Sequence, residues 1–480
     1  MKEDKSKMPT NIFELEESAI ERKSLYEKII NFSEEFIHTI EEQKAYHFDT
    51  NEITEYDSFF DIDKKKNSIE DILVFFKERV LNTGLNAASG GHLGYIPGGG
   101  IYTSALGDYL AAITNRYAGV FYASPGAVRM EDALINWTGK LIGYDKDFGG
   151  NLTSGGSMAN LIALHTAKHS KGIAISNVSK SVIYFTSQTH HSVYKALKIT
   201  GLEKCVLREI PVDSRFKMSV QDLETQIKHD KHIGLVPFLI IANAGSTDVG
   251  SVDPLIKLSN ISKAHHIWLH IDAAYGGFFK LTALGKDKLK GMELADSIIL
   301  DPHKGLFMPY GLGIVLVKNI KYLAEAHSYN ANSNYMRDAK NDNQYSPADL
   351  SPELSKHFRG LRMWLPLKLY GDTVFSEYLN EKLQLAYYLY QELSIIGYKV
   401  LCEPDLSVVA FRLELKGYES DVLNKIILDY IQQDGRIFIS STILDNKLTL
   451  RAAILSFRTH KQELDLLLCL LKKIKTHLDV

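Results

Sequence analysis

An anion site is predicted where segment 153–160 meets the helix that follows it. The segment reads TSGGSMAN, with Gly156 and Ser157 at its centre. Glycines let backbone N–H groups approach an anion closely, and a helix N-terminus adds partial positive charge, so a phosphate could bind here. The segment lacks the lysine of a P-loop and the glycine spacing of a dinucleotide site. Taken alone, it is interpreted by default as a glycine-rich helix cap without a ligand.

A carboxylate and a lysine each end an apolar run further along the chain. Asp272 closes residues 267–271, where a carboxylate is costly to bury unless a cation or a hydrogen-bond donor meets it. It could cap a helix, bind a metal ion or pair with a protonated heterocyclic nitrogen. Lys304 follows residues 297–300. A lysine of lowered pKa can form a Schiff base with a carbonyl, although a loop lysine is more often a solvated charge.

A histidine follows a third apolar run, residues 181–187. His190 could be a metal ligand, a base or a ring that stacks on a flat ligand. A metal site needs three or four convergent ligands, and the adjacent His191 is poorly placed to share one ion with it. We therefore rank a metal hydrolase below a cofactor site, and no metal ligand is predicted.

These segments fit one small molecule when they are taken together. In open α/β sheets, ligands bind at the carboxyl ends of the strands, where all four segments are expected. Gly156 and Ser157 would hold a phosphate, Asp272 a ring nitrogen, His190 a ring face and Lys304 an aldehyde. Pyridoxal 5′-phosphate has all of these groups, and the joint coincidence is far stronger than any single motif.

The apolar pattern predicts the elements that must position these residues. Short apolar runs alternate with helices, which indicates an α/β domain with a mostly parallel sheet covered by helices on both faces. Beyond residue 370, the pattern indicates a smaller α+β domain with antiparallel strands. The expected strands are 181–187, 238–244, 267–274, 296–300 and 313–318, then 406–415, 436–441 and 448–456; the expected helices are 158–169, 192–200, 254–265, 374–395 and 421–433, with a last one from 462.

Three parts are expected along the chain: a helical arm over 1–90, a large domain over 91–370 and a small domain over 371–480. The arm holds two amphipathic helices, 24–42 and 68–81, whose apolar stripes must be buried either on a partner subunit or on the chain's own main domain.

Composition narrows the class of protein. The 480 residues carry a net charge of −3, whereas nucleic-acid binding needs clustered positive charge, so the composition does not indicate it. Three separated cysteines form neither a zinc cluster nor a disulfide framework and suit a reducing compartment. No apolar stretch reaches the roughly 18 to 20 residues of a membrane helix, and the polar N-terminus has no apolar core of a signal peptide. A cytoplasmic protein is expected.

From about residue 20 to the C-terminus, and most strongly over 91–317, the sequence resembles the group II pyridoxal-phosphate-dependent amino-acid decarboxylases, which include the aromatic L-amino-acid decarboxylases. The motifs that carry the resemblance are 94–99 (GYIPGG), 123–127 (ASPGA), 153–160 (TSGGSMAN), 188–190 (QTH), 270–275 (HIDAAY) and 301–304 (DPHK). The resemblance implies the fold-type I architecture and an obligate homodimer with shared active sites, across which the N-terminal arm is exchanged. It implies decarboxylation of an L-amino acid to a primary amine and carbon dioxide.

The resemblance also implies a role for individual residues. Lys304 would form the Schiff base, Asp272 would pair with the ring nitrogen, and His190 would stack on the ring and act in protonation or carboxylate placement. A loop tyrosine, best matched by Tyr335 among Tyr329, Tyr335 and Tyr345, would deliver a proton; relatives that lack it tend toward oxidative aldehyde formation. Cofactor contacts are expected from Gly156, Ser157, His190, Thr247, Asp272, His303 and Lys304, and from Leu354 and Ser355 toward the other subunit's phosphate.

The substrate side chain is expected to lie against Tyr95, Ile96 and Pro97, a segment without a cationic group for an acidic substrate. An aromatic amino acid is therefore predicted, although Arg359 and Arg362 could overturn this. The alternatives are decarboxylation of a non-aromatic amino acid, another fold-type I reaction such as aldehyde synthesis, transamination or carbon–carbon cleavage, and an inactive cofactor-binding scaffold. Two positions depart from the common family pattern: Gly305 replaces a Trp, and Asp301 replaces an Asn and adds a negative charge near the phosphate region.

Overall fold

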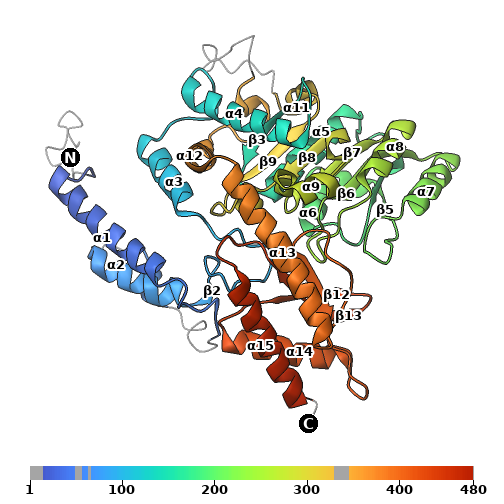
Figure 1. Ribbon diagram of the computed structural model, residues 1–480. Coiled ribbons are helices and arrows are strands. Elements are labelled where there is room, and N and C mark those ends of the chain that lie inside the picture. Colours follow the sequence, from blue (N-terminus) through green and yellow to red (C-terminus); the bar gives the residue numbers. More distant parts are fainter. Residues whose placement is uncertain (1–14, 49–56, 63–65, 329–344, 479–480) are drawn as a thin grey trace, which may run out of the picture.

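A seven-stranded sheet forms the centre of the protein, which a computed structural model describes over residues 15–48, 57–62, 66–328 and 345–478 (Figure 1). The strand order is β3-β9-β8-β7-β6-β4-β5, and the five strands from β8 to β5 pair in parallel. The mostly parallel sheet confirms the expected α/β class. The strands are β3 (Gly149–Thr153), β4 (Ser181–Phe185), β5 (Val206–Glu209), β6 (Val236–Asn243), β7 (Trp268–Asp272), β8 (Ser297–Leu300) and β9 (Gly313–Val317).

Strand β9 corrects one expectation, because it runs antiparallel to both of its neighbours, β3 and β8. The chain between β8 and β9 holds only the four-residue helix α10 (Pro302–Gly305). A parallel return needs a crossover that carries the chain back along the whole strand, usually through a longer helix. The short connection instead lets the chain turn back beside β8.

Helices cover both faces of this sheet because its strands are apolar on both sides. In β6, Ile240 and Ala242 belong to one core, and Leu239 and Ile241 belong to the other. The first core is shared with α4 (Pro125–Ile142), α7 (Val220–His232) and α8 (Leu255–His265); the second is shared with α5 (Gly156–Ser170), α6 (His191–Ile199) and α11 (Ile320–His327).

The C-terminal part forms a second, four-stranded antiparallel sheet in the order β10-β11-β13-β12. Gly435 ends α14 with φ +78°, as expected for a left-handed cap. The predicted strand 436–441 is displaced: β12 begins at Ser440, and Phe438 forms a parallel bridge with His92 instead. The elements are α13 (Thr373–Ile395), β10 (Lys399–Val400), β11 (Val408–Arg412), α14 (Ser420–Asp434), β12 (Ser440–Leu444), β13 (Lys447–Ala453) and α15 (Lys461–Leu478).

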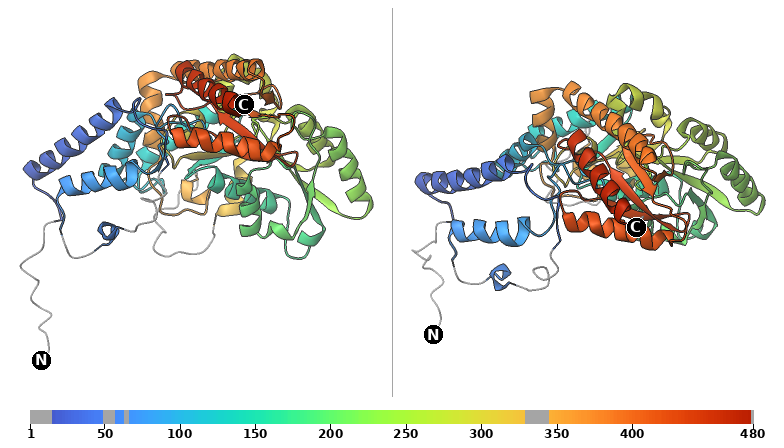
Figure 2. Two further views of the ribbon diagram at one scale, coloured as in Figure 1. Left: turned by 90° about the horizontal axis from the view of Figure 1, so that it is seen from below. Right: turned by 60° about the horizontal axis from the view of Figure 1, so that its bottom comes forward.

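The N-terminal helices α1 (Ala19–His38) and α2 (Ile69–Phe76) lie side by side and project from the body of the protein (Figures 1 and 2). Neither helix has a buried residue. The strands β1 (Tyr46–His47) and β2 (Gly84–Leu85) pair where the arm meets the C-terminal part, and α3 (Tyr102–Thr114) packs against α12 (Gly360–Tyr370). Within the described ranges, no helix is long and apolar enough to cross a membrane.

Candidate active site

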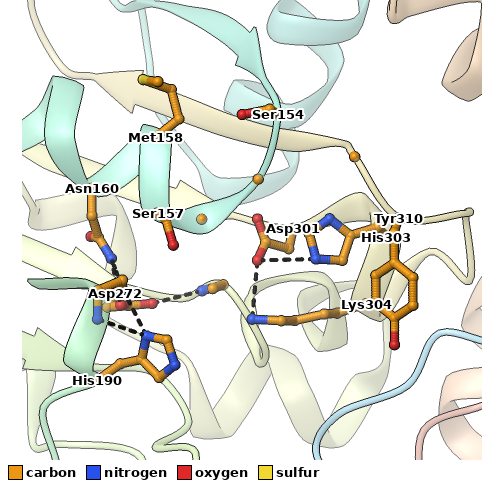
Figure 3. A pocket seen from close by; sticks show the side chains of 15 residues that line it. Ser154, Ser157, Met158, Asn160, His190, Asp272, Asp301, His303, Lys304 and Tyr310 are labelled. Carbon is orange, nitrogen blue, oxygen red and sulfur yellow. Dashed lines mark hydrogen bonds and ion pairs between the residues drawn. The ribbon is translucent and has the colours of Figure 1, made fainter. Parts of the chain in front are cut away.

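A cavity of 330 Å³ lies at the carboxyl ends of the central strands, where the four predicted segments meet (Figure 3). Its walls come from the turns that follow β3, β4, β7 and β8, which lie far apart in the sequence. The lining residues are Ser154, Gly155, Gly156, Ser157, Met158, Asn160, His190, Ser192, Asp272, Ala274, Asp301, His303, Lys304, Tyr310 and Gly311.

The N-terminus of α5 forms one wall of the cavity. The chain enters the helix through Gly155, whose φ of +146° is one that residues with a side chain rarely adopt. A Cβ atom at Gly156 would lie 2.8 Å from Asp301 Oδ2, so this position has no room for a side chain. The first N–H groups of a helix have no partner within it, so they can bind an anion that reaches the cavity.

Asp272 ends β7 and is 8% exposed. Its Oδ2 accepts a hydrogen bond of 2.9 Å from Asn160 Nδ2, and its Oδ1 accepts one of 3.1 Å from the backbone N–H of Ala274. Among the described residues, no lysine or arginine lies at ion-pair distance from it. A buried carboxylate without a cation is costly, and a ligand that brings a positive charge to this wall would offset that cost.

A chain of side chains behind Asp272 fixes its orientation. His270 Nε2 lies 2.9 Å from Asn160 Oδ1, which can only accept, so this nitrogen must carry the proton. His270 Nδ1 then accepts from Ser297 Oγ at 2.9 Å, and Ser297 Oγ accepts from Trp268 Nε1 at 2.9 Å. Burial lowers the pKa of His270, which keeps the ring neutral and this direction of donation intact. Asn160 is thereby held with its amide N–H toward Asp272.

His190 caps α6 and joins the same network from the side. Its Nδ1 lies 2.7 Å from Ser192 Oγ and accepts from the Ser192 backbone N–H at 3.3 Å, while Asn160 Nδ2 donates to Ser192 Oγ at 3.0 Å. Burial is the main cause that lowers the pKa of His190. The lowered pKa and the accepting Nδ1 both favour the neutral form of this imidazole, which lies beside Asp272 (Figure 3).

Lys304 lies on α10 and extends into the cavity from the side opposite Asp272, Asn160 and His190 (Figure 3). Its Nζ is 3.0 Å from Asp301 Oδ2, and His303 Nε2 is 3.6 Å from the same oxygen. His303 Nδ1 donates to the carbonyl of Leu312 at 2.6 Å. Asp301 stands where the family commonly has Asn, and its negative charge is balanced mainly by the ammonium group of Lys304.

Several predicted contacts do not line this cavity. Six predicted residues are absent from its walls: Thr247, Leu354, Ser355, Tyr95, Ile96 and Pro97. A seventh, Tyr335, lies outside the described residues. Four residues of the site and its surroundings were assigned no role from the sequence: Asn160, Ser192, His270 and Tyr310. The sequence could have indicated a role for Asn160 and His270, since both lie inside the quoted motifs. A polar side chain within an apolar run, as at His270, predicts a buried hydrogen-bond partner. Within the described part, no three His, Cys, Asp or Glu side chains converge as metal ligands.

The fold and the site together define a pyridoxal-phosphate enzyme of fold type I. The pyridoxal-dependent decarboxylase conserved domain matches residues 60–414, and the chain belongs to this family. It is similar to an aromatic-L-amino-acid decarboxylase of Bacillus atrophaeus, with 33% identity over 85% of each chain, and to a phenylacetaldehyde synthase of Arabidopsis thaliana, with 28% identity over 75% of this chain and 76% of the relative. A tryptophan decarboxylase of Catharanthus roseus, solved with L-tryptophan, shares the fold with a TM-score of 0.89, 22% identity and coverage of 97% and 100%.

Pyridoxal 5′-phosphate is accordingly the cofactor, and the residues present fit it. The start of α5 offers unpaired N–H groups and a surface without side chains at Gly155 and Gly156. Asp272 is a buried carboxylate without a cationic partner among the described residues. Lys304 is the only amine among the lining residues. Each of these matches a different group of the cofactor: phosphate, ring nitrogen and aldehyde.

Proposed function

We propose that the protein converts an aromatic L-amino acid into the corresponding primary amine and carbon dioxide, with Lys304, Asp272, His190 and the N-terminus of α5 as its active site. The observation that carries the proposal is the meeting of these groups in one cavity, in a chain that belongs to the pyridoxal-dependent decarboxylases.

Each wall of the cavity has a distinct role in this proposal. When bound, pyridoxal phosphate accepts the electron pair that departing carbon dioxide leaves behind. The start of α5, with Ser157, would hold the phosphate. A Cβ atom at Gly155 would lie 3.3 Å from His303 Cε1, which supports a phosphate contact from that ring as well. Lys304 would hold the aldehyde, and Asp272 would keep a proton on the ring nitrogen because an opposite charge favours the charged form. His190 would cover the ring face.

An aromatic substrate is supported by the relatives and by the arginines near the site. The relative of 33% identity is an aromatic-L-amino-acid decarboxylase. Arg359 Nη2 lies 2.9 Å from Glu353 Oε1, and Arg362 Nη2 lies 2.6 Å from Asp108 Oδ2. Because both guanidinium groups already face a carboxylate and neither lines the cavity, they are poorly placed to receive an acidic substrate side chain.

The substrate class is tested with purified protein loaded with pyridoxal phosphate. We expect kcat/KM for at least one of L-tryptophan, L-tyrosine, L-phenylalanine and a hydroxylated derivative to exceed that for L-glutamate and L-cysteine sulfinate by about 100-fold or more, since a charged side chain is costly to desolvate without a partner. Chromatography of the amine and release of carbon dioxide measure both sides of the reaction. Preferred turnover of an acidic amino acid would contradict the proposal.

Aldehyde formation is the second candidate, because the relatives include a phenylacetaldehyde synthase. That reaction consumes oxygen and water and releases aldehyde, ammonia, hydrogen peroxide and carbon dioxide. Tyr335, the proposed proton donor, favours the amine instead. Tyr335→Phe should lower amine output by about tenfold or more and raise peroxide and aldehyde, as oxygen uptake and chromatography would measure. Tyr345→Phe is the control; a shift in that variant alone would assign the role to Tyr345.

A homodimer is supported by the apolar side chains that the N-terminal arm leaves exposed in a single chain. Tyr26 is 52% exposed, and Val74, Phe76 and Val80 are also exposed. Large exposed apolar surfaces mark interaction sites, and a second copy would cover these helices. In such a dimer, Leu354 and Ser355 keep their predicted role toward the partner's phosphate.

We also propose that the chain divides into an arm, a large domain and a small domain at residues 90 and 370, and that the protein is cytoplasmic.

A further inference from the structure

Segment 88–99, which contains the predicted substrate-lining residues, is hydrogen-bonded to the C-terminal sheet. The backbone N–H of Leu93 donates to Phe438 at 2.8 Å, and that of Phe438 donates to Gly91 at 2.9 Å. The N–H of Ala453 donates to the carbonyl of Leu93 at 2.7 Å. This segment is therefore attached to residues more than 300 positions away in the chain.

The glycines of this segment are required by close approaches on its two sides. A Cβ atom at Gly94 would lie 2.2 Å from the ring of Phe438, and one at Gly98 would lie 2.3 Å from the carbonyl oxygen of His303. The segment thus lies between the C-terminal sheet and the backbone next to Lys304. A shift of the C-terminal sheet would move this segment relative to the cavity.

Arg451, on β13, connects the segment to a second loop. Its Nη2 donates to the carbonyl oxygens of Tyr95 at 2.9 Å and Thr247 at 2.6 Å, and its Nη1 donates to Ser440 Oγ at 2.8 Å. Arg451 is 3% exposed, and its Nε has no hydrogen-bond partner among the described residues. Taking a guanidinium group out of water is costly, and the hydrogen bonds to the two carbonyls and to Ser440 Oγ offset this cost.

The Tyr95 backbone needs such support. Its φ of +49° is in the left-handed region, which is unfavourable for a residue with a side chain. Tyr95 is also 61% exposed, so its own side chain does little to hold this conformation by burial. Ile96, the next residue, is instead packed in the main core. The hydrogen bond from Arg451 therefore acts at Tyr95, the one exposed residue between buried neighbours in segment 91–98.

We propose that Arg451 is a positioning residue that holds Tyr95 and the Thr247 loop in one arrangement and thereby sets the selectivity for the substrate side chain. The inference rests on the proposed function and on the expected placement of the substrate side chain against Tyr95, Ile96 and Pro97. These three residues do not line the 330 Å³ cavity, but their segment reaches the backbone next to Lys304 at Gly98. Arg451 acts here through backbone carbonyls.

The test compares Arg451→Met with Arg412→Met. Arg412 is the matched control: it is 2% exposed, lies in the same sheet on β11, and donates to Leu444 O at 3.5 Å, with no hydrogen bond to segment 88–99 among the described residues. For Arg451→Met we expect KM to rise by about 10- to 100-fold, the range for loss of charged hydrogen bonds, with kcat within about threefold. The ratio of kcat/KM between the best and worst aromatic amino acids should fall by about tenfold. Arg412→Met should leave KM and this ratio unchanged.

Two further measurements separate positioning from a general loss of structure. The visible absorbance of the bound cofactor should be retained, and amide hydrogen exchange should speed up in a peptide covering 92–98. If Arg451→Met does not fold, Arg451→Lys replaces it, with a smaller rise in KM. Guanidinium ion at millimolar concentration should lower the raised KM of Arg451→Ala.

The inference is overturned if selectivity and exchange of 92–98 match the wild type, or if both arginine variants lose selectivity equally. Failure of the proposed function looks different: the wild-type protein would then prefer a non-aromatic amino acid, while the faster exchange in Arg451→Met would still be measured.

Discussion

Replacing Lys304 with alanine should abolish decarboxylation, lowering kcat by at least about 1,000-fold, and should remove the visible absorbance of the covalently held cofactor. Lys304 is the only lysine among the residues that line the cavity, so no second amine in that lining can replace it. The phosphate site at the start of α5 does not depend on this side chain. Equilibrium dialysis should therefore still detect some bound cofactor, without the spectrum of the covalent form.

Lys321→Ala is the control for this experiment, since Lys321 is an exposed lysine on α11, away from the cavity lining. It should keep both the activity and the spectrum of the wild type. If Lys304→Ala instead retained decarboxylation together with the absorbance, the assignment of the covalent attachment site would be wrong.

Asp272→Asn should lower kcat by about 100- to 10,000-fold while the cofactor remains bound. Asparagine is close in size to aspartate and can still accept a hydrogen bond from the Ala274 backbone N–H, although its NH2 group then faces the Asn160 NH2 group and that hydrogen bond is lost. It lacks the negative charge that would hold a proton on the ring nitrogen, and without that proton the ring withdraws electrons weakly. Steady-state rates, normalised to cofactor content from absorbance, measure the effect.

Asp253→Asn is the matched control. Asp253 is also a buried carboxylate, 4% exposed, and accepts from the backbone N–H groups of Met218 and Asn243, but it does not line the cavity. Burial raises the pKa of Asp253 to about 6, so part of its population is already neutral near that pH. Its replacement should affect stability more than kcat per bound cofactor. Equal losses of kcat in both variants, or none in Asp272→Asn, would refute the role of Asp272.

The reactive groups were predictable from the sequence because strand ends determine where they must meet. Asp272 and Lys304 each follow an apolar run, Gly156 begins a helix after a glycine-rich turn, and parallel strands bring such positions to one edge of a sheet. Their convergence in one cavity follows from the alternation of strands and helices. The direction of β9 did not follow from that alternation, because it depends on how the chain turns back after the short helix α10.

The supporting residues depended on pairings that no local pattern encodes. Asn160 meets Asp272 across 112 positions, and Arg451 meets Tyr95 across 356. Residue types and their positions at the ends of strands were enough to predict the cofactor, whereas decarboxylation was implied by the resemblance of the motifs to a known family. The orientation of those groups, and the attachment of segment 88–99 to the C-terminal sheet, were decided by tertiary packing. Buried polar groups take whichever partner the folded chain brings within hydrogen-bond distance.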